Sequence, residues 1–217
     1  MILLSAYTEE YAHQASRLLA SCNKQGVSNA MCSMQTHGSW LQNVLQKPRI
    51  MLRMLAKVND PRVMWLDADA VVLRNPSAYF DEPWEHLSAS VREPRANEEM
   101  QNWSKGKTYA VRAGTIFMRK SDLTMAVIEA WADLCDEAKE NGEGRSVFLH
   151  GLEPMLWDAC VRFGVEVTDL PREYWYINGP GEMHRRIPIP ESAFICHHHT
   201  RIRRGPQGFG NRKWNRK

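Results

Sequence analysis

Residues 63–73 read VMWLDADAVVL, an apolar run, two aspartates separated by one alanine, and a second apolar run. An apolar run without alternation is typical of a parallel strand that is covered on both faces. Asp67 and Asp69 therefore follow the carboxyl end of a buried strand, which is where ligands bind in open α/β sheets. Burying two acids beside such a run is costly unless they are paired or bind a metal ion.

On both sides of this stretch, short apolar runs alternate with segments of helical spacing. The expected strands are residues 2–6, 27–34, 87–91, 109–118, 165–167 and 193–196. The expected helices are residues 11–22, 40–55, 123–141 and 154–163, and Pro48 either kinks the second of these or starts a new helix there. This alternation predicts an α/β fold with a mainly parallel central sheet flanked by helices.

Length and composition indicate one globular domain. The chain has 217 residues, of which 43% are hydrophobic and 24% charged, and this excludes a disordered chain. Residues 1–204 are expected to form the domain. Residues 205–217 form a basic tail that we expect to be flexible, since seven Lys/Arg and no acid stand between Arg201 and Lys217.

The five cysteines are scattered and include no CxxC pair, which excludes a disulfide framework and a zinc-ribbon pattern. Neither a signal peptide nor an apolar run of 18 residues is found. The sequence therefore predicts a cytoplasmic protein without a membrane span, of bacterial or phage origin. It gives no indication of the oligomeric state.

The two aspartates suit a hard divalent cation, Mn²⁺ or Mg²⁺, which prefers oxygen ligands and completes its shell with water and phosphate oxygens. A nucleoside-diphosphate leaving group needs such a cation to balance the negative charge that develops on it. A DxD pattern also occurs by chance as a simple loop cap, and the flanking apolar runs are what favour a site here.

At this point the chain resembles a known family, the GT-A nucleotide-diphospho-sugar transferases, and among them the glycogenin and lipopolysaccharide-galactosyltransferase group (family 8). The resemblance covers residues 2–204. It is carried by residues 47–83, by Thr8-Glu9-Glu10-Tyr11, by Val111–Ile116 and by Phe194–His197. It implies a glycosyltransferase that takes a hexose from a UDP-sugar and passes it to an acceptor.

The same resemblance implies which residues bind the donor. The loop after the first strand contributes Ala6, Tyr7, Thr8 and Tyr11, and the aromatic ring of Tyr11 stacks on the uracil. The remaining donor-binding residues are Lys47, Asp67, Ala68, Arg203 and Arg204. Lys47 is a point cation suited to a diphosphate, and the two arginines replace the family's lysine after the metal-binding histidine.

The metal ligands that the resemblance implies are Asp67, Asp69 and a histidine near the end of the last strand. Three histidines stand in a row there. His197 and His199 would share one face of a continuing strand, so both are candidates, with His197 first. A polar strand end without metal is the simpler alternative.

The acceptor side departs from the family. Arg112 stands where the family has asparagine before Ala113 and Gly114, and Leu152-Glu153 replaces the family's Asp-Gln pair. Glu153 and Asp69 are therefore the candidate catalytic residues. Glu153 is a candidate base, or a contact to a sugar hydroxyl, or an acid that stabilises a helix start. Retention and inversion of the sugar configuration both stay open.

The acceptor is unidentified: a glycan, a protein or a modified nucleic acid. Three roles stay open for the basic residues 201–217, namely closure of Arg201–Arg204 over the donor diphosphate, contact with a polyanionic acceptor, and a solvated chain end without function. Two other functions compete with sugar transfer. A sugar-phosphate nucleotidyltransferase needs a glycine-rich basic loop after the first strand, and residues 5–11 contain neither glycine nor a base. A nucleic-acid-binding module that uses the basic tail leaves Asp67 and Asp69 unexplained.

Overall fold

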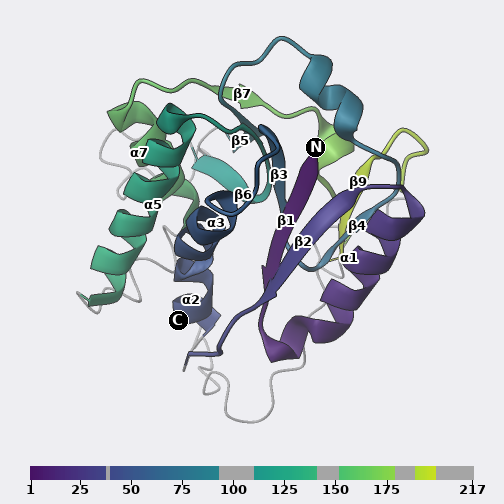
Figure 1. Cartoon of the computed structure of the whole chain (residues 1–217), viewed down its shortest axis with the longest axis horizontal. Helices are drawn as coiled ribbons and strands as arrows, with labels where there is room; N and C mark the ends of the chain where they lie inside the picture. The colour runs from purple at the N-terminus through teal and green to yellow at the C-terminus, as the bar shows by residue number, and fades with distance from the viewer. Residues whose placement is uncertain (38–39, 93–109, 141–151, 179–188, 199–217) are drawn as a thin grey trace, which may run out of the picture.

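The computed structural model of the chain describes residues 1–37, 40–92, 110–140, 152–178 and 189–198. A central sheet is covered on both faces, by α1 and a small second sheet on one side and by α3, α5 and α7 on the other (Figure 1). This is the α/β architecture that the alternating pattern predicts, with helices flanking the sheet.

Within the described residues, the central sheet has six strands in the order β2-β1-β3-β6-β5-β7. Their bounds are β1 Ile2–Tyr7, β2 Ser28–Ser33, β3 Arg62–Leu66, β5 Leu87–Arg92, β6 Ala110–Arg119 and β7 Val167–Asp169. The pairs β1–β2, β1–β3 and β5–β7 are parallel, whereas β6 runs antiparallel to both β3 and β5. The sheet is therefore mainly parallel, with one reversed strand in its middle.

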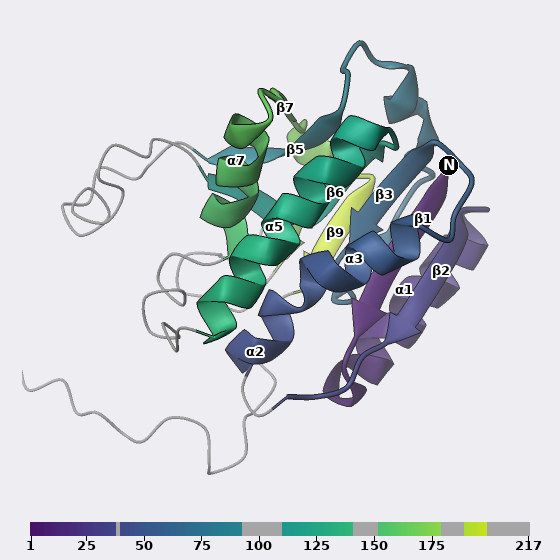
Figure 2. The same cartoon turned by 60° about the vertical axis from the view of Figure 1, so that its left-hand side comes forward.

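Helix α1 (Ala12–Lys24) covers one face, and α3 (Lys47–Leu55), α5 (Asp122–Glu140) and α7 (Leu152–Arg162) lie side by side on the other (Figure 2). The expected helix 40–55 is two helices, α2 (Trp40–Leu45) and α3. Pro48 lies in the first turn of α3 and starts this second helix, because proline needs no hydrogen bond to its nitrogen there. Three short 3-10 helices complete the described helical segments: η1 Glu9–Tyr11, η2 Ser77–Asp81 and η3 Arg172–Tyr174.

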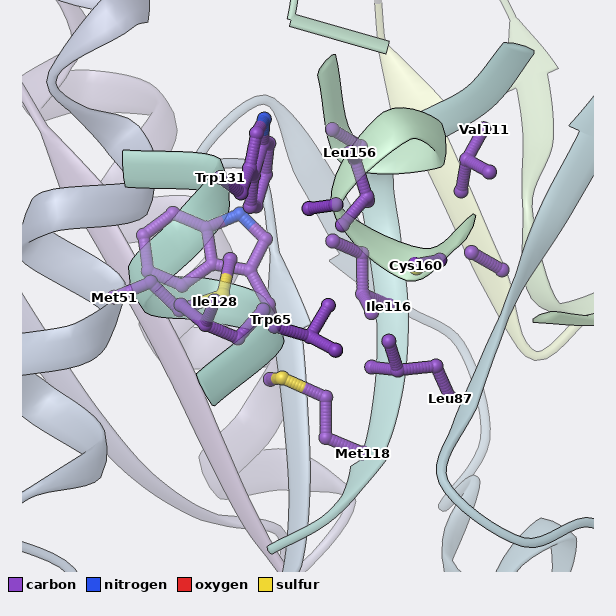
Figure 3. Packing of buried hydrophobic residues seen from close by; sticks show 14 of the residues in the cluster. Met51, Trp65, Leu87, Val111, Ile116, Met118, Ile128, Trp131, Leu156 and Cys160 are labelled. Atoms are coloured by element: carbon purple, nitrogen blue, oxygen red, sulfur yellow. The ribbon is translucent and has the colours of Figure 1, made fainter. Parts of the chain in front are cut away.

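The larger core fills the space between the sheet and the α3–α5–α7 layer (Figure 3). Trp65 from β3 and Trp131 from α5 are the two largest fully buried side chains and both belong to it. Trp131 also donates its indole N–H to the carbonyl oxygen of Leu152 at 3.0 Å, which ties α5 to the first turn of α7.

A second sheet of three strands, β4 (Ala70–Val72), β9 (Ile195–His198) and β8 (Tyr176–Asn178), lies on the α1 side of the molecule. The sequence predicts a strand at residues 193–196, which overlaps β9, but it does not predict a separate sheet, because β4 and β8 are too short to show a hydrophobic period. Strand β9 takes the middle place, antiparallel to β4 and parallel to β8. The apolar residues after Asp69 therefore belong to this sheet and not to the central one.

Element bounds shift by a few residues from those expected. Strands β7 and β9 each lie two residues later than expected. The basic tail, residues 205–217, and Arg201–Arg204 lie outside the described residues. Among the described helices, none combines the length and the apolar character that a membrane span needs.

Candidate functional site

The segment Asp67-Ala68-Asp69 connects the two sheets. Before it, Asp67 donates its backbone N–H to the carbonyl oxygen of Gly114 at 2.9 Å and so extends the β3–β6 ladder. After it, the carbonyl oxygen of Asp69 accepts the backbone N–H of His198 at 2.9 Å, and β4 pairs with β9. The two ladders therefore bring β6 and β9, which are distant in sequence, to the two aspartates.

Asp67 is held by two donors from the α3 side. Lys47 Nζ lies 2.6 Å from Asp67 Oδ1, and Trp65 Nε1 donates to the same oxygen at 3.1 Å. Lys47 also donates to the carbonyl oxygen of Ala113 at 3.3 Å, which links the first turn of α3 to β6. The Asp67 side chain is one-third exposed and that of Lys47 is 15% exposed, so solvent reaches this ion pair.

Asp69 faces His197. Asp69 Oδ1 lies 3.3 Å from His197 Nδ1, and the other ring nitrogen, Nε2, lies 2.7 Å from Thr115 Oγ1 on β6. His197 is 5% exposed and Thr115 is 2% exposed, so this imidazole is fixed on both sides in a buried place. The register of the strands explains why Thr115 and His197 lie close to the two aspartates. Thr115 pairs with Leu66, the residue before Asp67. His197 pairs with Ala70, the residue after Asp69.

Gly114 leaves the space in which these side chains meet. A Cβ atom built on Gly114 would lie 3.2 Å from His197 Cε1 and 3.6 Å from Asp67 Oδ2. The first distance is tighter than an ordinary van der Waals contact. Asp67 Oδ2 and the ring of His197 therefore both border the space that a side chain at position 114 would occupy.

These residues fit a divalent cation. Two ligands in adjacent positions of an octahedral ion lie about 3.0 Å apart if each bond is about 2.1 Å, and the Asp69 Oδ1 to His197 Nδ1 distance of 3.3 Å is close to that. Within the described residues, no group of three His, Cys, Asp or Glu side chains is already gathered as a metal site. The Oδ1 atom of Asp67 is paired with Lys47.

Of the two described histidines in this run, His197 is the one whose ring lies beside Asp69. His198 is half-buried, and its pKa is lowered by that burial first and by the positive charge of Arg17 second. His199 lies outside the described residues, as do Arg203 and Arg204.

The donor-side residues at the end of β1 lie at the same edge of the sheet as Asp67. Strands β1 and β3 are parallel, and Leu4 pairs with Trp65, so the chain after Tyr7 emerges beside the two aspartates. Ala6 and Tyr7 are half-buried and Thr8 is buried. Tyr11 ends the 3-10 helix η1 and directly precedes α1, and it is half-buried. Ala68 is buried between the aspartates.

On the acceptor side, β6 carries Arg112, whose guanidinium lies over the Trp175 ring at 4.7 Å from its centroid, and the buried Ala113. Leu152 is buried in the larger core at the first turn of α7. Glu153 follows it in the same turn and is half-buried. Helix α7 packs against β6, the strand that also carries Gly114.

Two partners in this site do not follow from the sequence motifs. Trp65 stands in an apolar run that predicts a core residue only, and its indole N–H also holds Asp67. Thr115 belongs to no recognisable motif for metal binding. A hydroxyl residue just before the apolar residues Ile116-Phe117-Met118 is nevertheless a signal of a buried hydrogen bond.

Solved structures share the fold of this chain over almost its whole length. A galactosyltransferase, LgtC, in complex with donor and acceptor sugar analogs, matches with a TM-score of 0.57 at 13% identity, over 93% of this chain and 88% of that one. A glycosyltransferase involved in glycosylation of the major capsid of PBCV-1 matches with a TM-score of 0.57 at 16% identity, over 90% and 91%. The chain has the GT-A fold.

The glycosyltransferase GlyE of Streptococcus pneumoniae TIGR4 has the same fold, with a TM-score of 0.58 at 14% identity over 92% of this chain. The chain spans 55% of the length of GlyE and 45% of the bifunctional glycosyltransferase WbbM. No family model and no curated protein matches the sequence. At these identities the likeness establishes the GT-A fold, and the reaction has to be argued from the site.

Proposed function

We propose that the protein is a metal-dependent glycosyltransferase that takes a hexose from a UDP-sugar. The observation that carries this proposal is that His197 lies 3.3 Å from Asp69 and shares the space beside Gly114 with Asp67. Two carboxylates and an imidazole are a ligand set for Mn²⁺ or Mg²⁺. A bound cation would supply the positive charge that stabilises the diphosphate as it leaves the sugar.

The other side chains then have separate tasks. Lys47, 2.6 Å from Asp67, is a second positive charge at the place proposed for the diphosphate. Tyr11, next to the end of β1, is proposed to stack on the uracil. Glu153 in the first turn of α7 is proposed as the base that takes the proton of the acceptor hydroxyl. Arg203 and Arg204 are proposed to bind donor phosphate oxygens bidentately.

The neighbouring structures support this reading in two ways. They are glycosyltransferases, and LgtC holds a donor analog and an acceptor analog in the shared fold. Neither a nucleotidyltransferase nor a nucleic-acid-binding module gains support from the fold or from the site. The acceptor stays open among a glycan, a protein and a modified nucleic acid, with the polyanionic choice resting on the basic tail.

One assay tests both the class and the donor. The protein is incubated with a panel of sugar nucleotides and Mn²⁺, and slow hydrolysis of the donor is followed by chromatography. We expect hydrolysis of one UDP-sugar, its loss in the presence of a chelator and its return with Mn²⁺.

Asp69→Asn is the matched variant. It should bind Mn²⁺ poorly and cost about 4 kcal/mol of transition-state stabilisation, on the order of a thousandfold in rate. Asp81→Asn, an exposed aspartate in η2, is the control and should behave as wild type. Full turnover in chelator would refute the metal dependence.

A further inference from the structure

The two oxygens of the Asp67 carboxylate have different surroundings. Oδ1 accepts the indole N–H of Trp65 at 3.1 Å and lies 2.6 Å from Lys47 Nζ. Oδ2 lies 3.6 Å from the Cβ position that a side chain at Gly114 would have, and His197 Nδ1 lies 3.7 Å from the same position. One oxygen is therefore engaged by donors of the protein, and the other borders the space that the carboxylate shares with the histidine.

We infer that Trp65 is a positioning residue whose indole N–H holds Oδ1 of Asp67, so that Oδ2 is the oxygen that Asp67 offers to the cation. This inference rests on the metal site of the proposed function, and it names the binding oxygen and the residue that selects it. Trp65 acts through Asp67 alone, since its side chain is 1% exposed and belongs to the larger core.

The direction of this hydrogen bond follows from the chemistry of its two partners. An indole nitrogen can only donate, and an ionised carboxylate can only accept. The distance of 3.1 Å lies within the usual range for an N–H···O bond. Trp65 and Asp67 stand two positions apart at the end of β3, so an extended chain places both side chains on the same face.

Lys47 alone would not select one of the two oxygens. Its ammonium group is a point charge on a flexible stem and donates in three directions, so it can follow either oxygen of a carboxylate that rotates. The ring of Trp65 is packed among buried side chains and cannot follow such a rotation (Figure 3). Trp65 therefore fixes the rotation of the Asp67 carboxylate, and Lys47 adds positive charge to the oxygen that Trp65 has selected.

The first test compares two buried tryptophans. Trp65→Phe removes the N–H and keeps an aromatic ring, so the Asp67 carboxylate is free to rotate. Trp131→Phe is the matched control, because Trp131 is also fully buried and donates its indole N–H to the carbonyl oxygen of Leu152 at 3.0 Å. Mn²⁺ affinity is measured by the electron paramagnetic resonance signal of free Mn²⁺, and circular dichroism checks that both variants fold. The affinity should fall about 10–100-fold in Trp65→Phe, the usual loss for a partner that orients a metal ligand, and stay unchanged in Trp131→Phe.

The second test leaves Trp65 in place and decides the question if Trp65→Phe does not fold. The indole ¹H–¹⁵N signals of the wild type are assigned through their contacts with neighbouring residues and are followed during a titration with Mg²⁺. The Trp65 signal should shift with the same apparent Kd as the backbone signal of Asp69. In the metal-free protein, Asp67→Asn should move the Trp65 signal more than the Trp131 signal, because it replaces a charged acceptor by a neutral one.

Three results would overturn the inference. They are a Trp65 signal that stays in place while Mg²⁺ shifts the Asp69 signal, unchanged Mn²⁺ affinity in a folded Trp65→Phe, and an equal loss of affinity in Trp65→Phe and Trp131→Phe. Each of them leaves the proposed metal site standing. If the wild type binds neither Mn²⁺ nor Mg²⁺, the metal dependence of the proposed function is refuted, and the role of Trp65 falls with it.

Discussion

Lys47 Nζ lies 2.6 Å from Asp67 Oδ1, so the first aspartate of the pair is already neutralised by a cation of the protein. The lysine comes from the first turn of α3, and the aspartate follows β3. A divalent cation that binds both aspartates has to compete with this ammonium group for Asp67. The same ammonium group is then available to the diphosphate that arrives with the donor.

Lys47→Met tests this competition. Without the ammonium group, Mn²⁺ alone should bind about fivefold more tightly, because an ion pair of this exposure contributes about 1 kcal/mol. UDP should bind more weakly, because its diphosphate loses a cation. Both affinities can be measured by titration calorimetry. Lys57→Met, an exposed lysine just after α3, is the control, and unchanged affinities in both variants would contradict the assignment of Lys47 to the site.

Gly114→Ala places a methyl group into the site itself. The new Cβ would lie 3.2 Å from His197 Cε1, so the imidazole has to shift by a few tenths of an ångström from its place next to Asp69. We expect Mn²⁺ affinity and donor hydrolysis to fall at least about tenfold, since catalytic geometry tolerates little displacement.

Gly164→Ala is the matched control for that prediction. Gly164 has a φ of 65°, and a Cβ added there would meet no other atom within 4 Å. Alanine at this position should therefore cost about 1 kcal/mol of stability without changing Mn²⁺ affinity. If Gly114→Ala behaves in the same way, the space at Gly114 has no role in the site.

Much of this fold could be predicted from the sequence, because apolar runs and helical spacing follow the burial of each element. The strand before Asp67 and the helix expected at residues 123–141, which is α5, are examples. The direction of β6 could not be predicted, because an apolar run reads the same for a parallel and an antiparallel strand. Strands β4 and β8 have only three residues each, too few to show a period.

The site could be predicted in part. The sequence predicts that Asp67, Asp69 and His197 bind one metal ion, and this stays a prediction. The structure places Asp69 3.3 Å from His197, and it places Asp67 and His197 beside Gly114. The partners of these side chains could not be read from the sequence. Thr115 meets His197 across 82 positions of chain, and Lys47 reaches Asp67 because α3 packs on β1, the neighbour of β3 in the sheet. Such contacts depend on register and packing, and local patterns carry neither.

Acid should weaken the contact between α3 and α5. Arg49 donates to Asp136 Oδ2 at 2.8 and 3.0 Å, and Lys139 donates to Asp136 Oδ1 at 2.5 Å. Burial alone raises the pKa of Asp136, but the hydrogen bonds from Lys139 and Arg49 outweigh it and hold the pKa below its ordinary value. A lowered pKa in the folded state means that the contribution to stability is present above about pH 4 and is lost as the pH falls further.

Asp136→Asn should therefore reduce the free energy of unfolding by about 0.5–1 kcal/mol at neutral pH, a discounted value because the carboxylate is partly exposed to solvent. Urea unfolding at neutral pH and at about pH 3 measures the difference, which should shrink at the lower pH. Asp133→Asn, which removes the more exposed partner of Arg49, should cost less. An equal loss at both pH values would contradict the ion-pair explanation.

Glu153→Gln separates a catalytic base from a contact that only binds or caps. Glu153 lies in the first turn of α7, where a negative charge also favours the helix by about 0.3–1 kcal/mol. The amide keeps the shape of the carboxylate but accepts no proton at working pH. If Glu153 is the base, transfer should fall about 100-fold or more while the affinity for the UDP-sugar is unchanged, because only an interaction made in the transition state is removed.

The measurement compares single-turnover transfer with donor affinity, and Asp158→Asn in the same helix controls for lost charge. Transfer within about tenfold of wild type would mean that Glu153 contacts the acceptor or stabilises the helix start, and that another group takes the proton.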